Sequence, residues 1–200
     1  AAGSVTLGTG SANTLTIGDA TDFTFDGVIS ENGNLSKTGA GIATLAGANT
    51  YVGTTTISSG TLSVTGSIAA GGSVSVNGGT LGGDGTVNSP VSMTGAGGSI
   101  APGLSPGILT VDGNVTFDAA GSFDVELDGT AVGTQYDQLQ VTGASRTVTT
   151  NGASLNVVPG FTPTAVDTFT IVNLVDGSSS LVFTTPFTDP NNGGAALGDL

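Results

Sequence analysis

The stretch GNLSKTGAGIATLAGANTYVGTTTISSGTLSVT, residues 33–65, decides the fold of this chain. Short runs in which apolar and polar residues alternate, such as Thr55-Thr56-Ile57 and Leu62-Ser63-Val64, stand between turns of Gly, Asn and Ser. Such alternation places one side of a strand in a core and the other side in water. The stretch therefore predicts short, half-buried β-strands that follow one another closely.

The rest of the chain repeats this design. Gly interrupts every window long enough to test for a helix, and turn dipeptides such as Asn32-Gly33 and Asp84-Gly85 supply the positive φ of tight corners. We therefore expect an all-β protein. The expected strands are 4–7, 14–17, 22–25, 34–36, 43–45, 54–57, 61–64, 73–76, 86–87, 91–93, 108–111, 114–117, 122–127, 138–141, 147–149, 154–158, 168–173 and 181–184.

These strands could form either a stack of coils or a series of antiparallel hairpins, because the same turn dipeptides serve both. Near-repeats such as GTLSV (60–64) and GSVSV (72–76) favour coils, since each reads as the same corner followed by the same strand. We predict a right-handed parallel β-helix of about eight to ten coils of about 20–25 residues, with strands about 4.8 Å apart. The alternative is an antiparallel β-sandwich.

Composition suggests two regions. Residues 1–120 are rich in Gly and Thr and are expected to form β-helix repeats. Residues 121–200 have longer strands and more Phe, and are expected to continue the helix, to become more sandwich-like, or to form a C-terminal β cap. The segment SIAPGLSPGIL (99–109) is expected to be an inserted loop, because it contains Pro102 and Pro106.

Charge and composition exclude several classes of function. The chain has 15 acidic and 2 basic residues, Lys37 and Arg146, and a net charge of −13. Nucleic acids and anionic membranes both require clustered cations, so we expect neither as a partner. There is no Cys for a disulfide scaffold or a thiolate site, and no apolar run long enough to span a membrane as a helix. The start AAGSVTLG is typical of a mature secreted protein or of a piece of a longer one.

The repeats resemble a known family at GANTYVGTTTISSGTLSV (47–64), GGTLGGDGTVNSPVSM (78–93), APGLSPGILTVDGNVTF (101–117) and YDQLQVTG (136–143). These segments are similar to the autotransporter-associated β-strand repeat of secreted bacterial passenger domains, over residues 33–183. The resemblance implies a right-handed parallel β-helix that is secreted and displayed at the cell surface. It implies no catalytic residues.

Acidic residues are the candidates for chemistry. In SFDVELD (122–128), the residues Asp124, Glu126 and Asp128 are predicted to share one face of a strand, about 6.6–7 Å apart, near the separation used by inverting glycosidases. The simpler interpretation is a solvated strand face, because a glycan groove usually also has aromatic platforms. Calcium is a second hypothesis, with oxygen ligands from Asp22 and Asp26, from the acidic residues of 122–128, or from Asp137, although diffuse binding of cations by the net charge explains these acids better than a specific site.

Other side chains suggest no reaction. The chain has no His or Cys for a nucleophilic triad, and Ser36 and Lys37 face opposite sides of their strand. We expect no catalytic, cofactor-binding or metal site and no cofactor. Thr-rich segments at 54–56, 147–150 and 184–185 are explained by β propensity, or by an adhesive face for glycans or matrix.

The scarcity of Lys predicts self-association, because soluble proteins usually protect open strand edges with Lys, Pro or a cap. The sequence therefore predicts a non-enzymatic, extracellular structural protein, a β-helical stalk or passenger segment for display, adhesion or self-association. The alternatives are a subunit of an extracellular filament stacked end to end and a polysaccharide-active β-helix enzyme.

Overall fold

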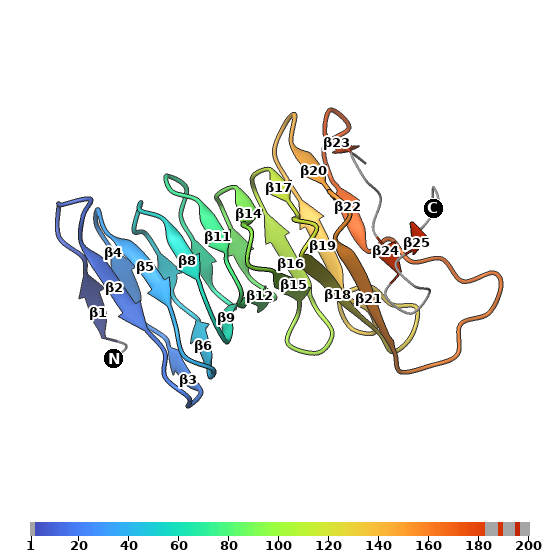
Figure 1. Ribbon diagram of the computed structural model, residues 1–200, viewed down its shortest axis with the longest axis horizontal. Coiled ribbons are helices and arrows are strands. Elements are labelled where there is room, and N and C mark those ends of the chain that lie inside the picture. Colours follow the sequence, from blue (N-terminus) through green and yellow to red (C-terminus); the bar gives the residue numbers. More distant parts are fainter. Residues whose placement is uncertain (1–2, 183–187, 190–194, 197–200) are drawn as a thin grey trace.

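The computed structural model describes residues 3–182, 188–189 and 195–196. Within them the chain forms strands joined by turns, and it contains no helix long and apolar enough to cross a membrane. Successive strands wind into coils that lie side by side along the molecule (Figure 1). All strand pairs between neighbouring coils are parallel, so the protein is a right-handed parallel β-helix.

Each coil contributes one strand to each of three faces. The six-stranded sheet contains β7 (Ala48–Asn49), β10 (Ser67–Ile68), β13 (Thr86–Val87), β16 (Ile108–Val111), β19 (Gln138–Val141) and β22 (Val172–Leu174), and the pair β1 (Ser4–Thr6) and β4 (Val28–Ser30) precedes it. The eight-stranded sheet contains β2 (Thr14–Ile17), β5 (Asn34–Lys37), β8 (Thr55–Ile57), β11 (Val74–Val76), β14 (Val91–Met93), β17 (Val115–Thr116), β20 (Thr147–Thr149) and β23 (Ser180–Val182). The nine-stranded sheet contains β3 (Phe23–Phe25), β6 (Ile42–Leu45), β9 (Thr61–Val64), β12 (Thr80–Gly83), β15 (Gly98–Pro102), β18 (Gly121–Leu127), β21 (Ser154–Pro159), β24 (Thr188–Asp189) and β25 (Ala195–Ala196).

The core is a set of rows that run along the helix axis, with one residue from each coil. In one row of the nine-stranded sheet, Leu62, Leu81, Ile100 and Phe123 are register partners, and all four side chains are fully buried. Complete burial of such a side chain stabilises the fold by on the order of 2 kcal/mol. Each of these side chains packs against its register partners in the neighbouring coils, so the coils stabilise one another.

The parallel register confirms the prediction of coils and shows that the antiparallel sandwich is wrong. The predicted alternation of inward and outward residues is confirmed, since every second residue of β18 is buried. The corners turn the chain into the next face instead of reversing it, and the next coil then meets the previous one in parallel. Within the described residues, the antiparallel pair of named strands is β24 with β25.

Several strands escaped prediction because they are too short or too irregular for a pattern of alternation. β4 has two adjacent apolar residues, β7 and β10 have two residues each, and β12 ends in Gly82 and Gly83. The segment 99–109 is also not wholly a loop. Its first part forms β15, in which Pro102 pairs with Gly83, and the loop is confined to the residues before β16. The expected strand 168–173 is shifted to β22.

Coil length changes along the chain. Register partners lie 24 residues apart at Ser4 and Val28 and 19 apart at Leu62 and Leu81, but 30 apart at Leu109 and Leu139 and 33 apart at Leu139 and Val172. The extra residues form loops at the corners, and the strands keep their register. Eight coils are described, one for each strand of the eight-stranded sheet, in line with the expected number. The division near residue 120 stays a prediction.

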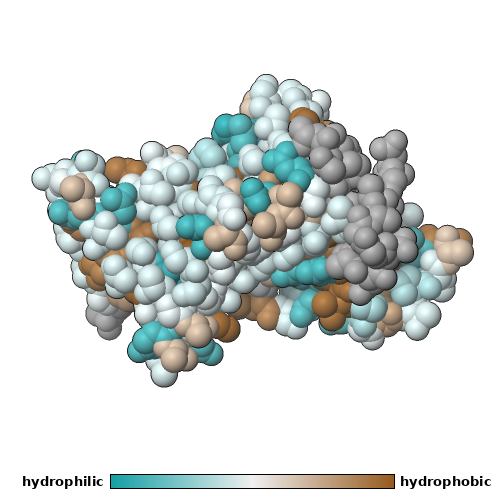
Figure 2. Space-filling model, in the orientation of Figure 1, coloured by the Kyte–Doolittle hydropathy of each residue, from teal (hydrophilic) through white to brown (hydrophobic). Residues whose placement is uncertain are grey.

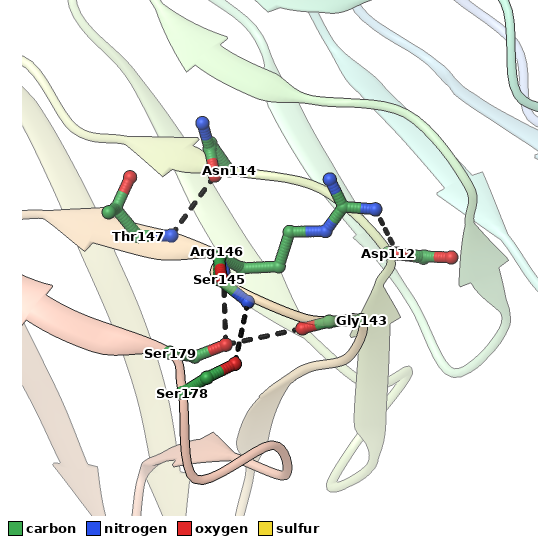
Figure 3. Close-up of polar contacts among 8 residues, drawn as sticks. All are labelled: Asp112, Asn114, Gly143, Ser145, Arg146, Thr147, Ser178 and Ser179. Carbon is green, nitrogen blue, oxygen red and sulfur yellow. Dashed lines mark hydrogen bonds and ion pairs between the residues drawn. The ribbon is translucent and has the colours of Figure 1, made fainter.

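Polar side chains connect consecutive coils at the corner that precedes the eight-stranded sheet. Asn34 Oδ1 accepts a 2.9 Å hydrogen bond from the N–H of Thr54, and Asn114 Oδ1 accepts a 3.0 Å bond from Thr147 at the equivalent place. Beside Asn114, the Arg146 guanidinium donates to Asp112 Oδ1 at 2.7 Å (Figure 3). The backbone of Arg146 donates to a serine hydroxyl of the next coil, so this corner links three coils.

Candidate functional site

A groove crosses the outer face of the nine-stranded sheet, parallel to the helix axis. It has a volume of about 290 Å³. Its floor consists of small residues from three successive coils, because Ser63, Gly82 and Ala101 are register partners on β9, β12 and β15. Leu104, from the loop after β15, and Val158 add apolar walls.

Ser63 lies on the outward side of β9, but its side chain is buried. It is 1% exposed, and its Oγ has no hydrogen-bond partner among the residues that the structure describes. A buried hydroxyl without a partner destabilises a protein by about 1–3 kcal/mol. Ser63 is therefore a polar group of the groove whose hydrogen-bonding capacity is unused.

The acidic residues Asp124, Glu126 and Asp137 lie toward the C-terminal end of the groove. Asp124 and Glu126 occupy the outer face of β18, as predicted, whereas Asp128 follows the end of this strand and lies outside the groove lining. Asp124 Oδ1 accepts a 2.7 Å hydrogen bond from Asn156 Nδ2. Glu126 Oε2 is buried and has no partner within the described residues.

Asp137 holds the backbone beneath the acidic end of the groove. Its Oδ1 accepts the N–H of Gly107 at 2.8 Å, and its Oδ2 accepts the N–H of Glu126 at 2.8 Å. Burial raises the pKa of the Asp137 carboxyl above its ordinary value, and the two backbone hydrogen bonds oppose this increase. Asp137 therefore fixes the position of Glu126 and of the loop before β16.

The structure gives no support to the calcium hypothesis. Both carboxylate oxygens of Asp137 are already used by backbone N–H groups, and Asp22 Oδ1 accepts the N–H of Ile42 at 2.7 Å. Asp26 is exposed. In the described part of the chain, no three acidic side chains come together where they could hold a metal ion. Diffuse cation binding stays a prediction.

The side chains of the Thr-rich segments do not all face outward. Thr55 points into the core, and its hydroxyl forms a 2.6 Å hydrogen bond with the buried hydroxyl of Tyr51. Thr150 is also buried. Thr56, Thr147 and Thr149 are half-buried on the outer side of their strands. The pair at 184–185 lies outside the described residues.

The single lysine of the chain is buried, which sequence patterns did not predict. Lys37 ends β5 on the inward side, in the row between Ile17 and Ile57, and is 0% exposed. Its Nζ donates to the carbonyls of Thr38, Gly39 and Ser59 at 2.9, 2.9 and 3.0 Å. The strict alternation of Leu35 and Lys37 was the signal available, since it places both on the same face.

The N-terminal face of the described coils is apolar. No described strand pairs with the outer edges of β1, β2 and β3. A cavity of about 130 Å³ opens there, and Phe23 is 38% exposed. The cavity is lined by Val5, Leu15, Ile17, Phe23, Phe25, Ile29 and Leu45.

Comparison with known proteins agrees with the repeat seen in the coils. Residues 35–64 match a family model described as the passenger-associated-transport-repeat. This segment runs from β5 through β9 and so covers about one and a half coils. No match to the chain was found among curated proteins. Within the parallel β-helix, residues 35–64 are thus similar to the passenger-associated-transport-repeat, which agrees with the resemblance to the autotransporter-associated repeat.

Proposed function

We propose that this chain is part of the secreted passenger of an autotransporter, displayed at the cell surface as a stiff, non-enzymatic stalk. The observation that carries this proposal is the parallel register of eight successive coils, and residues 35–64, about one and a half coils, match the passenger repeat. A ladder of this kind is rigid because each coil is hydrogen-bonded and packed on both sides. Stiffness along the axis is the property that a stalk requires.

The outer surface supports a mechanical role. Figure 2 shows a face on which residues of intermediate hydropathy predominate, with strongly hydrophilic and strongly hydrophobic residues scattered among them. The strands supply Ser and Thr to this surface at positions such as Thr44, Ser75 and Thr116. A hydroxyl-rich surface of low charge density suits exposure to an external medium, and it is compatible with weak contacts to glycans or matrix.

Surface display can be tested on cells of the organism that makes the protein. An antibody raised against residues 3–182 should label intact cells, and an external protease should remove the label. Labelling that appears only after the outer membrane has been permeabilised would contradict the proposal. A periplasmic protein serves as the control for cell integrity.

The apolar N-terminal face of the described coils favours a second candidate role, the association of copies end to end. The apolar cavity and the unpaired edges of β1, β2 and β3 offer another coil both a core and a backbone ladder. We propose that a second copy of this chain covers the cavity. Sedimentation velocity should show concentration-dependent association, and Leu15→Lys should abolish it because Leu15 lines the cavity.

The control for this experiment is Val52→Lys, which places the same charge at an exposed residue outside the cavity. This variant should associate like the parent protein. A parent protein that remains monomeric at every concentration would reject association while leaving surface display intact. Polysaccharide cleavage by Asp124 and Glu126 stays an untested prediction, since no contact in the groove favours it over a structural role.

A further inference from the structure

The corner between the nine-stranded and the six-stranded sheet carries much of the extra length of the C-terminal coils. In four N-terminal coils this corner is a turn of two residues, as at Thr65-Gly66 between β9 and β10. In the next three coils it grows to residues 103–107, 128–137 and 160–171. Insertions that gather at one corner of a stack of coils are often the part of a repeat protein that other molecules contact.

Residues 160–171 form the longest of these loops, and it extends past the last strands at the right of the molecule (Figure 1, orange). Its two ends are held together, because the rings of Phe161 and Phe169 meet edge to face with their centroids 5.9 Å apart. Phe169 also meets the ring of Tyr136 in the preceding loop, at 5.4 Å. The segment is therefore an Ω-loop with a closed base. Val166 at its tip is 86% exposed, more than any other large apolar side chain among the described residues.

The backbone of this Ω-loop is not bonded to the coils. For residues 161–169, the hydrogen bonds formed with described residues are those of one turn, in which Thr164 and Asp167 bond to each other. The loop at 128–137 is nearly as long but differs, since the Ala131 carbonyl alone accepts three of its N–H groups. A protease binds its substrate as an extended strand and pairs with the backbone of that strand. Of the two loops, the Ω-loop is the one whose backbone is available for such pairing.

The residues at the tip select the class of protease. Trypsin-like proteases require a basic residue, but Lys37 is buried and the N–H of Arg146 is bonded to the Ser179 hydroxyl at a short corner. Proteases that prefer aromatic residues would have to open the ring contact at the base of the loop. The tip residues, Ala165 and Val166, are exposed and small, and they suit the small pocket of an elastase-like serine protease.

We propose that the Ω-loop is a processing site, at which an elastase-like serine protease cuts the chain once, after Ala165 or Val166, and leaves the coils stacked. Hydrolysis breaks one peptide C–N bond and adds one water, which leaves a carboxylate on the residue before the bond and an amino group on the residue after it. The part beyond the cut stays in place, because β22 and β23 keep their parallel pairs with β19 and β20, and Phe169 keeps its contact with Tyr136. The site depends on the stack of coils and not on the proposed display at the cell surface.

Limited digestion of the full chain with pancreatic elastase tests the proposal. Mass spectrometry should place the first cut within residues 3–182 directly after one of the two tip residues, and the two pieces should elute together in size-exclusion chromatography under native conditions. Trypsin should leave the folded chain intact. Val52, Leu104 and Val175 are also exposed, but they lie in corners whose backbone is bonded to a neighbouring coil. A first cut at any of these three, or pieces that separate under native conditions, would overturn the proposal.

Two variants test whether the tip itself is recognised. The double variant Ala165→Asp, Val166→Asp places charges that a small apolar pocket rejects, and it should slow the first cut about tenfold or more. Val175→Asp introduces the same charge at another exposed aliphatic residue and should be cut at the rate of the parent protein. Thermal unfolding of each variant establishes that it is folded. A double variant that is cut as fast as the parent would show that the Ω-loop is not the site.

Discussion

The ammonium of Lys37 donates a 3.0 Å hydrogen bond to the carbonyl of Ser59, which lies one coil further along the helix. Its other two donors reach the carbonyls of Thr38 and Gly39 in its own coil. A buried charge thus satisfies three carbonyls at a corner where the backbone leaves the sheet. Burial lowers the pKa of Lys37, and the nearby carboxylate of Asp19 opposes this effect.

Replacing Lys37 by Met should destabilise the protein. Methionine has a similar length but no donor, so three carbonyls at the corner would lose their partner. Hydrogen bonds to charged groups have a net value of about 1.5–3 kcal/mol, and we expect a loss of about 3 kcal/mol in the free energy of unfolding. Urea denaturation measures it. Arg146→Met, which removes a half-exposed ion pair, should cost less than about 1 kcal/mol, and an equal cost would contradict the role given to Lys37.

Tyr51 should make the fold sensitive to alkali. Burial raises its pKa to about 12, from 10.0, against the opposing hydrogen bond to Thr55. Between these values the unfolded chain loses the phenol proton and the folded chain keeps it, so stability should fall as the pH rises from about 10 to about 12. The total loss is on the order of 3 kcal/mol.

The comparison with Tyr51→Phe isolates this effect from other titrations. The variant should be less stable than the parent by about 1 kcal/mol at neutral pH, because the Thr55 hydroxyl loses its partner. The difference in the free energy of unfolding should then vanish or reverse above pH 10, because only the parent has a buried phenol whose ionisation favours the unfolded chain. Denaturant unfolding at several alkaline pH values measures both curves, and parallel curves would show that Tyr51 does not resist ionisation.

Asp137→Asn should loosen the acidic end of the groove. An amide offers one acceptor oxygen, so either the N–H of Gly107 or that of Glu126 would face a donor. We expect a loss of about 2 kcal/mol. Because the folded-state pKa of Asp137 is raised above 3.8, the folded parent binds a proton more tightly than the unfolded chain. The parent's advantage over the variant in the free energy of unfolding should therefore decrease as the pH rises from 3.8 through the folded-state pKa of Asp137.

Hydrogen exchange provides the structural readout for this variant. The amides of Gly107 and Glu126 should exchange faster in Asp137→Asn than in the parent, whereas amides in the N-terminal coils should be unchanged. Asp118→Asn is the control, since its carboxylate holds a surface turn at Ala120. Unchanged protection at Gly107 and Glu126 would show that Asp137 does not hold this backbone.

Two glycines with nearly the same positive φ should respond differently to substitution by alanine. Gly60 and Gly95 have φ of 61° and 63°, so both variants incur the same backbone strain, about 1 kcal/mol. A Cβ at Gly60 would lie 2.4 Å from the carbonyl oxygen of Gly39 and 2.7 Å from Lys37 Nζ, whereas nothing lies within 4 Å at Gly95. Thermal unfolding should therefore show a much larger loss for Gly60→Ala, and similar losses would contradict the close packing of the coils.

Strands were predicted well where alternation was strict, whereas of the two-residue strands β13 was predicted and β7 and β10 were missed. Two-residue strands such as β7 and β10 form because they pair with a strand of the neighbouring coil. That strand is distant in sequence, so a local pattern of residues does not predict the pairing. The choice of coils over hairpins came from near-repeats. The growth of coil length to 33 residues was not predicted, because corner loops carry no periodicity.

The groove was predicted only in part. The outward positions of Asp124 and Glu126 followed from alternation on one strand. Their relation to Ser63 did not, since it depends on register across four coils that are far apart in sequence. Asp137 was considered as a calcium ligand, but its role in holding backbone N–H groups arises from the loop before β16.

Distances between spin labels test the stacking of coils most directly, and the absence of Cys makes labelling of introduced cysteines specific. Thr16, Ser92, Thr116 and Thr149 lie in one outward row of the eight-stranded sheet. Labels at Thr16 and each of the other three should be separated by about 19, 24 and 29 Å, an increase of about 4.8 Å per coil. Distances that fail to increase steadily with coil number, as in a sandwich of hairpins, would contradict the β-helix.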